Sequence, residues 1–286
     1  MQPISVVTAL KEYSMPNPMM NDKAIDEAAR APGWGAPSAA SRSTVIPGTP
    51  IDDGPVSTWQ SGVMTIRGTM TAGGVLLVLL LGAATFGWAS APDAARGTTG
   101  FPGMALVAVL VGFGCAIAVH FKPMMAKVLG PIYALAQGFF LGVISKAYND
   151  AYEGIVVQAV GATLAVFAVM LFLYQSRIIK VTDRFRRIVI MATMGLMAFY
   201  LISIVINLVG GSVPFLQSAS PLGILFSVFA AGLAAMMLAV NFDTIERGAK
   251  AGWPKGMEWY CAFGLLATLV WLYLEILQLL AKLNRR

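Results

Sequence analysis

The sequence predicts an all-α, polytopic membrane protein with seven transmembrane helices. Seven long apolar stretches, separated by short charged or Gly/Pro-rich loops, fill residues 70 to 283. The 286-residue chain is 57% hydrophobic and only 12% charged, whereas about a quarter of the residues of a soluble domain are charged. The apolar stretches are continuous rather than alternating, which excludes a transmembrane barrel. A helix needs ~20 apolar residues to cross ~30 Å of hydrocarbon, and there it satisfies its own backbone hydrogen bonds.

The first 62 residues differ in composition from the rest of the chain. Segments 32–38 and 46–55 are rich in Gly, Pro, Ser and Thr, and no apolar period persists long enough to build a core. No basic segment followed by an apolar one marks a cleavable signal peptide. We therefore expect a disordered N-terminal tail over 1–62 and a seven-helix transmembrane domain over 63–286, whose first span starts translocation.

The predicted spans share a length of about 20 residues and have Gly or Pro in their connections. They are 70–91, 103–121, 129–147, 155–175, 187–209, 221–243 and 260–282. In chain order the breaking residues are Pro92 and Pro102, Pro123 and Pro131, Gly210, Gly211, Pro214 and Pro221, and finally Gly252 and Pro254.

Lys and Arg in the short loops predict the orientation, because cytoplasmic loops carry the excess of basic residues. Ten lie in the even-numbered loops and two, Arg96 and Lys146, in the odd-numbered ones. The ten are Lys122, Lys127, Arg177, Lys180, Arg184, Arg186, Arg187, Arg247, Lys250 and Lys255. We therefore expect a cytoplasmic N-terminus, although the basic C-terminal residues argue mildly the other way. Because the basic residues flank the membrane, the net charge of +6 indicates lipid headgroups and not nucleic acid as the partner.

Residue patterns typical of enzymes and metal centres are absent from the sequence. His120 is the one histidine, and neither a nucleophile elbow nor a phosphate-binding loop motif occurs. At the inner end of the second span, His120 is most simply an interfacial residue, with pH sensing as the alternative. Cys115 and Cys261 fall inside apolar stretches and fit small buried hydrophobes. We expect neither catalysis nor a resident cofactor.

Two acidic residues inside the spans are the strongest candidates for function, since each costs at least ~2.5–3.5 kcal/mol at the bilayer centre. Asp243 ends the sixth span, where an ion pair with Arg247, four residues on, is the simpler interpretation. Glu275 lies well inside the seventh span among leucines, with no Lys or Arg within one turn. Two carboxylates from adjacent helices would share protons and bind a hard cation such as Ca²⁺. Such a pair would form a pH-dependent latch.

Smaller signals concern the contacts between helices. Gly138 and Gly142 form a GxxxG motif, which lets two helix backbones approach closely. Gln137 and Asn207 are polar residues within spans, and they fit interhelical hydrogen bonds or, alternatively, a conduction path.

Several motifs in order resemble one known family. The third span carries Pro131, Tyr133, Gln137, Gly138 and Gly142, the sixth closes with Phe-Asp-Thr, and the seventh contains Leu-Tyr-Leu-acid-Ile. With seven spans, residues 64–286 resemble the Bax-inhibitor-motif transmembrane family, and more narrowly its bacterial branch with a long N-terminal tail. The resemblance implies six helices around a central seventh, and a pH-sensitive calcium leak governed by two acids that match Asp243 and Glu275.

This sequence departs from that family pattern in three ways. The second acid is Glu rather than Asp, the second span has no acidic residue, and the two acids are 32 residues apart, a longer interval than the resemblance implies. Glu258, just before the seventh span, is therefore a second candidate partner for Asp243. We expect a calcium leak in a bacterial inner membrane. The alternative is a non-conducting regulator that binds another membrane protein, such as a protease or secretion component.

Overall fold

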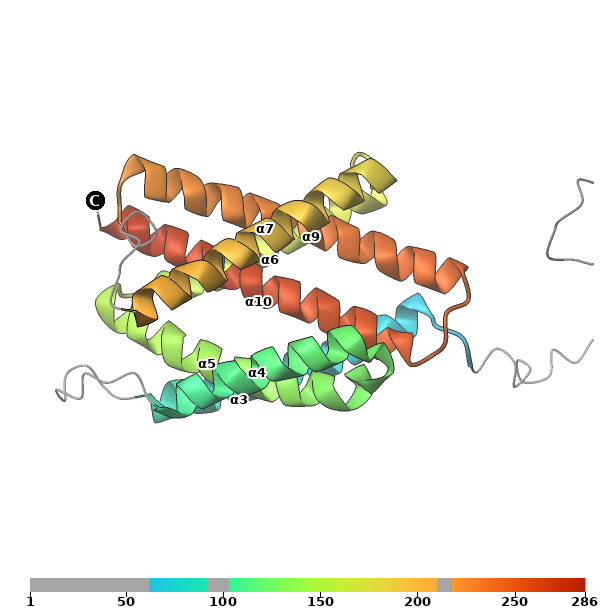
Figure 1. Cartoon of the computed structure of the whole chain (residues 1–286), viewed down its shortest axis with the longest axis horizontal. Helices are drawn as coiled ribbons and strands as arrows, with labels where there is room; N and C mark the ends of the chain where they lie inside the picture. Colours follow the sequence, from blue (N-terminus) through green and yellow to red (C-terminus); the bar gives the residue numbers. More distant parts are fainter. Residues whose placement is uncertain (1–61, 92–102, 210–217, 286) are drawn as a thin grey trace, which may run out of the picture. The chain divides into compact units, whose positions relative to one another are not determined.

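Each predicted span forms one α-helix in the computed structural model, which describes residues 62–91, 103–209 and 218–285 (Figure 1). The helices are α3 (Ile66–Ser90), α4 (Gly103–Phe121), α5 (Ala126–Ala151), α6 (Ile155–Gln175), α7 (Asp183–Leu208), α9 (Pro221–Lys250) and α10 (Met257–Asn284), with a 3-10 turn, η5 (Pro123–Met125), before α5. Within these ranges the backbone forms no strand, and it makes one isolated bridge between Val63 and Pro254. The predicted all-α class is confirmed.

Polar residues set where several helices begin. Thr65, Thr182 and Ser220 precede α3, α7 and α9, and each side-chain oxygen accepts a hydrogen bond from the backbone N–H three residues on. The predicted second and fourth spans coincide with α4 and α6. In contrast, α9 continues past the predicted end at 243 to Lys250. Hydropathy marks only the apolar part of a helix, whereas this last segment of α9 is charged and lies beyond it.

Helix α10 is central to the bundle. It packs against α3, α5, α6 and α9, and in Figure 1 it runs between one group formed by α3, α4 and α5 and another formed by α6, α7 and α9. Helix α7 packs mainly on α9. The expected central position of the seventh helix is thus confirmed.

The close contact between α3 and α5 depends on glycine. A Cβ atom on Gly138 would lie 2.9 Å from the Cβ of Ala83 and would overlap the carbonyl oxygen of Leu80. One on Gly142 would meet the backbone of α3 at Ala84. The predicted GxxxG contact is confirmed, with α3 as its partner.

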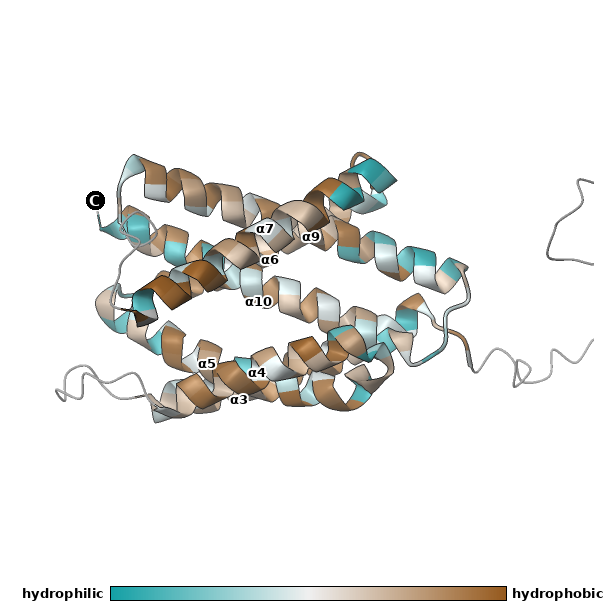
Figure 2. Cartoon of the chain, in the orientation of Figure 1, coloured by the Kyte–Doolittle hydropathy of each residue, from teal (hydrophilic) through white to brown (hydrophobic). Residues whose placement is uncertain are grey.

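Across the described ranges, seven helices are long and apolar enough to cross a membrane. Large apolar side chains are exposed along the outer faces of α3, α4 and α7, among them Val78, Leu110 and Ile202, and Figure 2 shows these helices brown, with teal residues gathered toward the ends of the bundle. Such a surface suits hydrocarbon rather than water. The protein is therefore a multi-pass membrane protein. The predicted disordered tail, 1–62, lies outside the described part of the chain except for Gly62.

Candidate functional site

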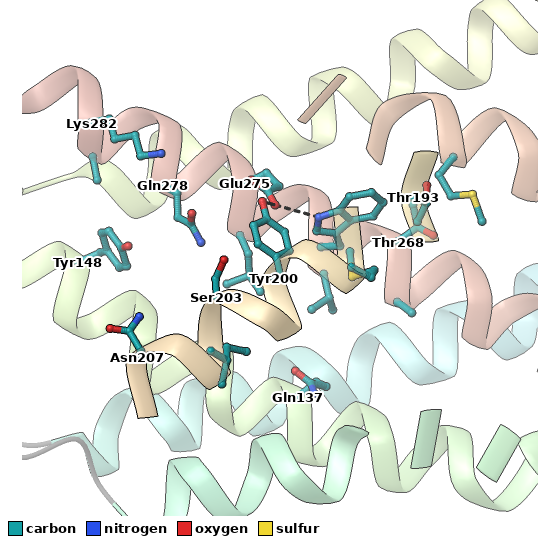
Figure 3. A pocket seen from close by; sticks show the side chains of 18 of the residues that line it. Gln137, Tyr148, Thr193, Tyr200, Ser203, Asn207, Thr268, Glu275, Gln278 and Lys282 are labelled. Carbon is teal, nitrogen blue, oxygen red and sulfur yellow. Dashed lines mark hydrogen bonds between the residues drawn. The ribbon is translucent and has the colours of Figure 1, made fainter. Parts of the chain in front are cut away.

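Glu275 is the most deeply buried acid in the described part of the chain, with 2% of its surface exposed. Its Oε1 atom accepts hydrogen bonds from the Tyr200 hydroxyl at 2.6 Å and from the Trp271 indole N–H at 3.0 Å (Figure 3). Its Oε2 atom has no hydrogen-bond partner among the described residues. In the part of the chain that the structure describes, therefore, only neutral donors bond directly to this carboxylate.

The nearest basic residue on α10 is directed elsewhere. Lys282 lies about two helical turns beyond Glu275 and donates hydrogen bonds to the Gly223 carbonyl at 3.1 Å and to Ser227 Oγ at 2.7 Å, both on α9. Lys282 is thus hydrogen-bonded to α9, and its interaction with Glu275 is electrostatic and at longer range, without a direct hydrogen bond.

Glu275 faces a cavity of about 810 Å³ between α5, α7 and α10. Its lining residues come from α5, α7 and α10, with Met237 from α9, and Figure 3 shows many of their side chains around it. Thr193 also lines this cavity, and its buried Oγ1 atom has no partner within the described ranges. Buried polar atoms are nearly always satisfied by protein, water or ligand. The two unpartnered oxygens thus leave room in the cavity for water or another polar group to pair with them.

A polar stripe extends from Glu275 toward the C-terminal end of α10. Its members repeat at helical spacing on two facing helices and all line the cavity: Tyr200, Ser203 and Asn207 on α7, and Glu275, Gln278 and Lys282 on α10. Arg285 closes the stripe and donates to the Tyr152 hydroxyl at 2.9 Å.

Asp243 belongs to an ion-pair cluster at the opposite end of the bundle. Its carboxylate lies 2.7 Å from Nε of Arg247, four residues on, and 4.0 Å from Arg186 of α7. Arg247 also pairs with Asp183 at 3.2 Å and donates to the carbonyl of Val181 at the same distance. The simpler interpretation of Asp243, an ion pair with Arg247, is confirmed, and the pair extends from α9 to the start of α7.

Glu246 extends this cluster to α6. It accepts hydrogen bonds from the Tyr174 hydroxyl, from Arg177 at 2.7 Å and from Lys250 at 2.6 Å. The hydrogen bond to Glu246 raises the pKa of the exposed Arg177 guanidinium, which therefore stays charged. The cluster holds the ends of α6, α7 and α9 together.

Glu258 occupies a third environment, at the N-terminus of α3. It is 6% exposed and accepts hydrogen bonds from the backbone N–H of Thr65 at 2.9 Å and from its hydroxyl at 3.0 Å. Gly68 leaves the space that the carboxylate fills, because a Cβ there would overlap it. A carboxylate is favourable at a helix N-terminus, where unpaired N–H groups carry partial positive charge.

The structure does not bring Asp243 together with either glutamate, so the direct acid pair expected from the sequence is not formed. Asn241 donates to Thr268 Oγ1 at 2.7 Å, which sets the register between the antiparallel helices α9 and α10. In that register Asp243 is level with Leu266, so Glu275 lies nine residues, or roughly 14 Å at 1.5 Å per residue, further along α10. Each acid is instead bonded to its own partners: arginines for Asp243, Tyr200 and Trp271 for Glu275, and Thr65 for Glu258.

The remaining candidates from the sequence are His120, Gln137 and Asn207, which, within the described ranges, are not direct partners of any of the three acids. His120 is exposed at the end of α4, edge-on to Phe121 at 5.6 Å between ring centres, as an interfacial residue would be. Gln137 lies against Gly112 of α4 and lines the cavity, and Asn207 lines it from α7.

Sequence reasoning missed Tyr200, Trp271, Thr193 and Glu246. The spacing of four residues would have indicated Trp271 as a donor to Glu275 and Lys250 as a partner of Glu246. No sequence signal indicates Tyr200, which lies 75 residues from Glu275.

Comparison with known proteins agrees with the motifs in the sequence. A family model described as Bax inhibitor 1 like matches residues 17–285. No curated protein and no solved structure matches the chain.

Proposed function

The chain belongs to the Bax inhibitor 1-like family. From this premise we propose that the protein is a pH-sensitive cation leak. Its permeant ion is Ca²⁺, which passes through the cavity beside Glu275. One observation carries the proposal. Glu275 is a carboxylate within the membrane that bonds, among the described residues, only to neutral donors, and its second oxygen has no described partner beside a cavity. Ionisable residues inside membrane helices commonly mark ion paths.

The lining of the cavity suits a hard cation. Ca²⁺ binds carboxylate, amide and hydroxyl oxygens, and Glu275, Gln278, Ser203 and Asn207 supply these groups along the polar stripe. Passage requires that such sites bind weakly enough for the ion to leave. A single carboxylate with neutral neighbours fits that requirement better than a cage of acids would.

The ion-pair cluster around Asp243 is the gate of the proposed path. It ties α6, α7 and α9 at the end opposite the polar stripe. The hydrogen bond from Asn241 to Thr268, which lines the cavity, joins α9 to α10. Ion pairs between carboxylates and arginines weaken in acid, so we expect acid to loosen this end, where Asp243 pairs with Arg247 and Arg186, and to increase the flux.

The excess of basic residues assigns the cluster to the cytoplasmic side. In this proposal the protein lies in a bacterial inner membrane with its N-terminus inside. The bilayer is its partner, and it acts without catalysis, resident cofactor or nucleic acid. Ca²⁺ is the ion that the protein conducts and not a bound cofactor.

Calcium flux into proteoliposomes that contain only this protein, measured across pH, tests the proposal. Wild type should conduct and conduct more at acid pH. Asp243→Asn should be open with a flattened pH profile, whereas Glu275→Gln should reduce the flux at every pH because the cation loses its charged ligand. Absence of flux at every pH in wild type would overturn the proposal and favour a non-conducting regulator of another membrane protein.

A further inference from the structure

The cavity beside Glu275 is far larger than a bare cation needs. Its volume is about 810 Å³, whereas one water molecule takes about 30 Å³ of liquid and sites for drug-sized ligands span roughly 300–1,000 Å³. We propose that this cavity binds a lipophilic organic cation, such as a quaternary ammonium or phosphonium with aryl groups, that enters from the lipid. The proposal shares Glu275 with the proposed cation path but does not require conduction.

The negative charge of the Glu275 carboxylate favours a cation as the ligand of this cavity. Glu275 is the one acid among the described lining residues, and its Oε2 atom is unpartnered. The basic lining residues, Lys282 and Arg285, lie at the far end and are bonded to α9 and to Tyr152. A cation with a diffuse charge can thus approach Glu275 without meeting either base. A small anion would be repelled by the same carboxylate.

Aromatic rings surround the carboxylate. Tyr200 and Trp271 bond directly to Glu275, and Tyr133 and Tyr148 line the cavity from α5. Organic cations bind to the faces of such rings, and aromatic cages recognise quaternary ammonium groups. A path built only for a hydrated metal ion would not need four aromatic side chains at its wall.

Apart from the polar stripe and the polar side chains of Gln137, Thr193 and Thr268, the rest of the wall is apolar, and part of it lies on α7, whose outer face is exposed. The apolar side chains are Met197, Ile204, Met237, Ala267, Val270, Leu274 and Ala281. Met197 and Ile204 belong to α7 and are 36% and 56% exposed. They stand beside other exposed apolar residues of α7, such as Leu201 and Val205. The apolar side of the cavity therefore adjoins the exposed apolar face of a membrane helix, the side from which a ligand dissolved in the bilayer would enter, and Met197 can adapt to its shape.

Equilibrium binding of radiolabelled tetraphenylphosphonium to the purified full-length protein in detergent tests this inference. We expect saturable binding of about one ligand per chain, weakened by about ten-fold or more in Glu275→Gln and at acid pH. The matched control is Glu153→Gln, the same chemical change at an exposed residue outside the cavity, which should bind as wild type does. Tetraphenylborate, an anion of the same shape, should bind wild type much more weakly.

A second variant covers the case in which Glu275→Gln does not fold. Ala267→Phe fills the cavity from α10 while keeping the carboxylate, and it should also abolish binding. Equal binding of the phosphonium and the borate, or wild-type affinity in Ala267→Phe or a folded Glu275→Gln protein, would overturn the inference. Calcium flux without phosphonium binding would refute this inference alone, whereas phosphonium binding without flux would refute only the proposed leak.

Discussion

Tyr200 of α7 donates a 2.6 Å hydrogen bond to Glu275 of α10 across the cavity. It is the one direct hydrogen bond between a described residue of another helix and this carboxylate, because the second donor, Trp271, lies on α10 itself. The pair links two helices that otherwise meet little, since α7 packs mainly on α9.

Replacing Tyr200 with Phe removes this donor while keeping the ring. We expect a loss of about 1–2 kcal/mol in the free energy of unfolding, because a buried acceptor loses a partner. Thermal or denaturant unfolding in detergent measures the loss. Tyr133→Phe is the matched control: Tyr133 also lines the cavity but makes no hydrogen bond through its hydroxyl to the described residues. Equal stability of the two variants would show that the bond to Glu275 contributes nothing.

The glycine contact between α3 and α5 gives a second prediction. Gly138→Ala should lower stability by roughly 1–3 kcal/mol, because the added methyl group would overlap the backbone of α3. Gly195 of α7 has no atom within 4 Å of the position of its Cβ, so Gly195→Ala should be neutral or slightly stabilising. If the two alanine variants unfold alike, the close approach is not what holds these helices together.

The fold could be predicted from the sequence further than the site could. The length of the apolar stretches in the sequence was enough to predict the bounds of α4 and α6, because a membrane helix must be continuous and apolar. The spacing of four residues indicated the Asp243–Arg247 pair, since local contacts on a helix follow from its period. The partners of Glu275 and Glu258 could not be found in this way. Tyr200 and Thr65 lie 75 and 193 residues away from them, and only the packing of the helices brings these residues together.

The predicted orientation can be tested with reporter fusions. A reporter inserted within 176–186, among the basic residues of the fourth loop, should be cytoplasmic, and one within 210–219 should be outside. Reactivity of single introduced cysteines with an impermeant reagent gives an independent measurement. The opposite pattern would show that the protein has the reverse orientation in the membrane, with the ion-pair cluster outside. It would not change the number of spans.

Arg247 offers a test of the proposed gate that leaves every acid in place. It bridges Asp243 and Asp183, so Arg247→Gln should loosen this end and raise calcium flux at neutral pH, as is expected of Asp243→Asn. The control is Arg184→Gln, a change at an exposed base next to Asp183 in sequence, for which no ion pair is seen within the described ranges. Unchanged flux in Arg247→Gln, with a functioning wild type, would separate the cluster from gating and leave it a purely structural feature.

The last prediction concerns the attachment of the first helix to the seventh. Glu258 binds the N-terminus of α3 through Thr65, and the same segment pairs with the α9–α10 connection through Met64 N–H to the Trp253 carbonyl at 2.7 Å. Glu258→Ala removes a buried acceptor and a favourable charge at a helix N-terminus, so we expect a loss of about 1–3 kcal/mol in the free energy of unfolding.

Two controls isolate this contact. Glu153→Ala removes an exposed acid and should leave the unfolding midpoint unchanged. Deleting residues 2–55 keeps Met64 and Thr65, and it should also be neutral, because the sequence of that tail predicts no packed core. A deletion that destabilises the protein as much as Glu258→Ala would show that the tail packs on the bundle. A neutral Glu258→Ala would show instead that α3 is held by its glycine contact with α5, and that the buried carboxylate at its N-terminus adds no stability.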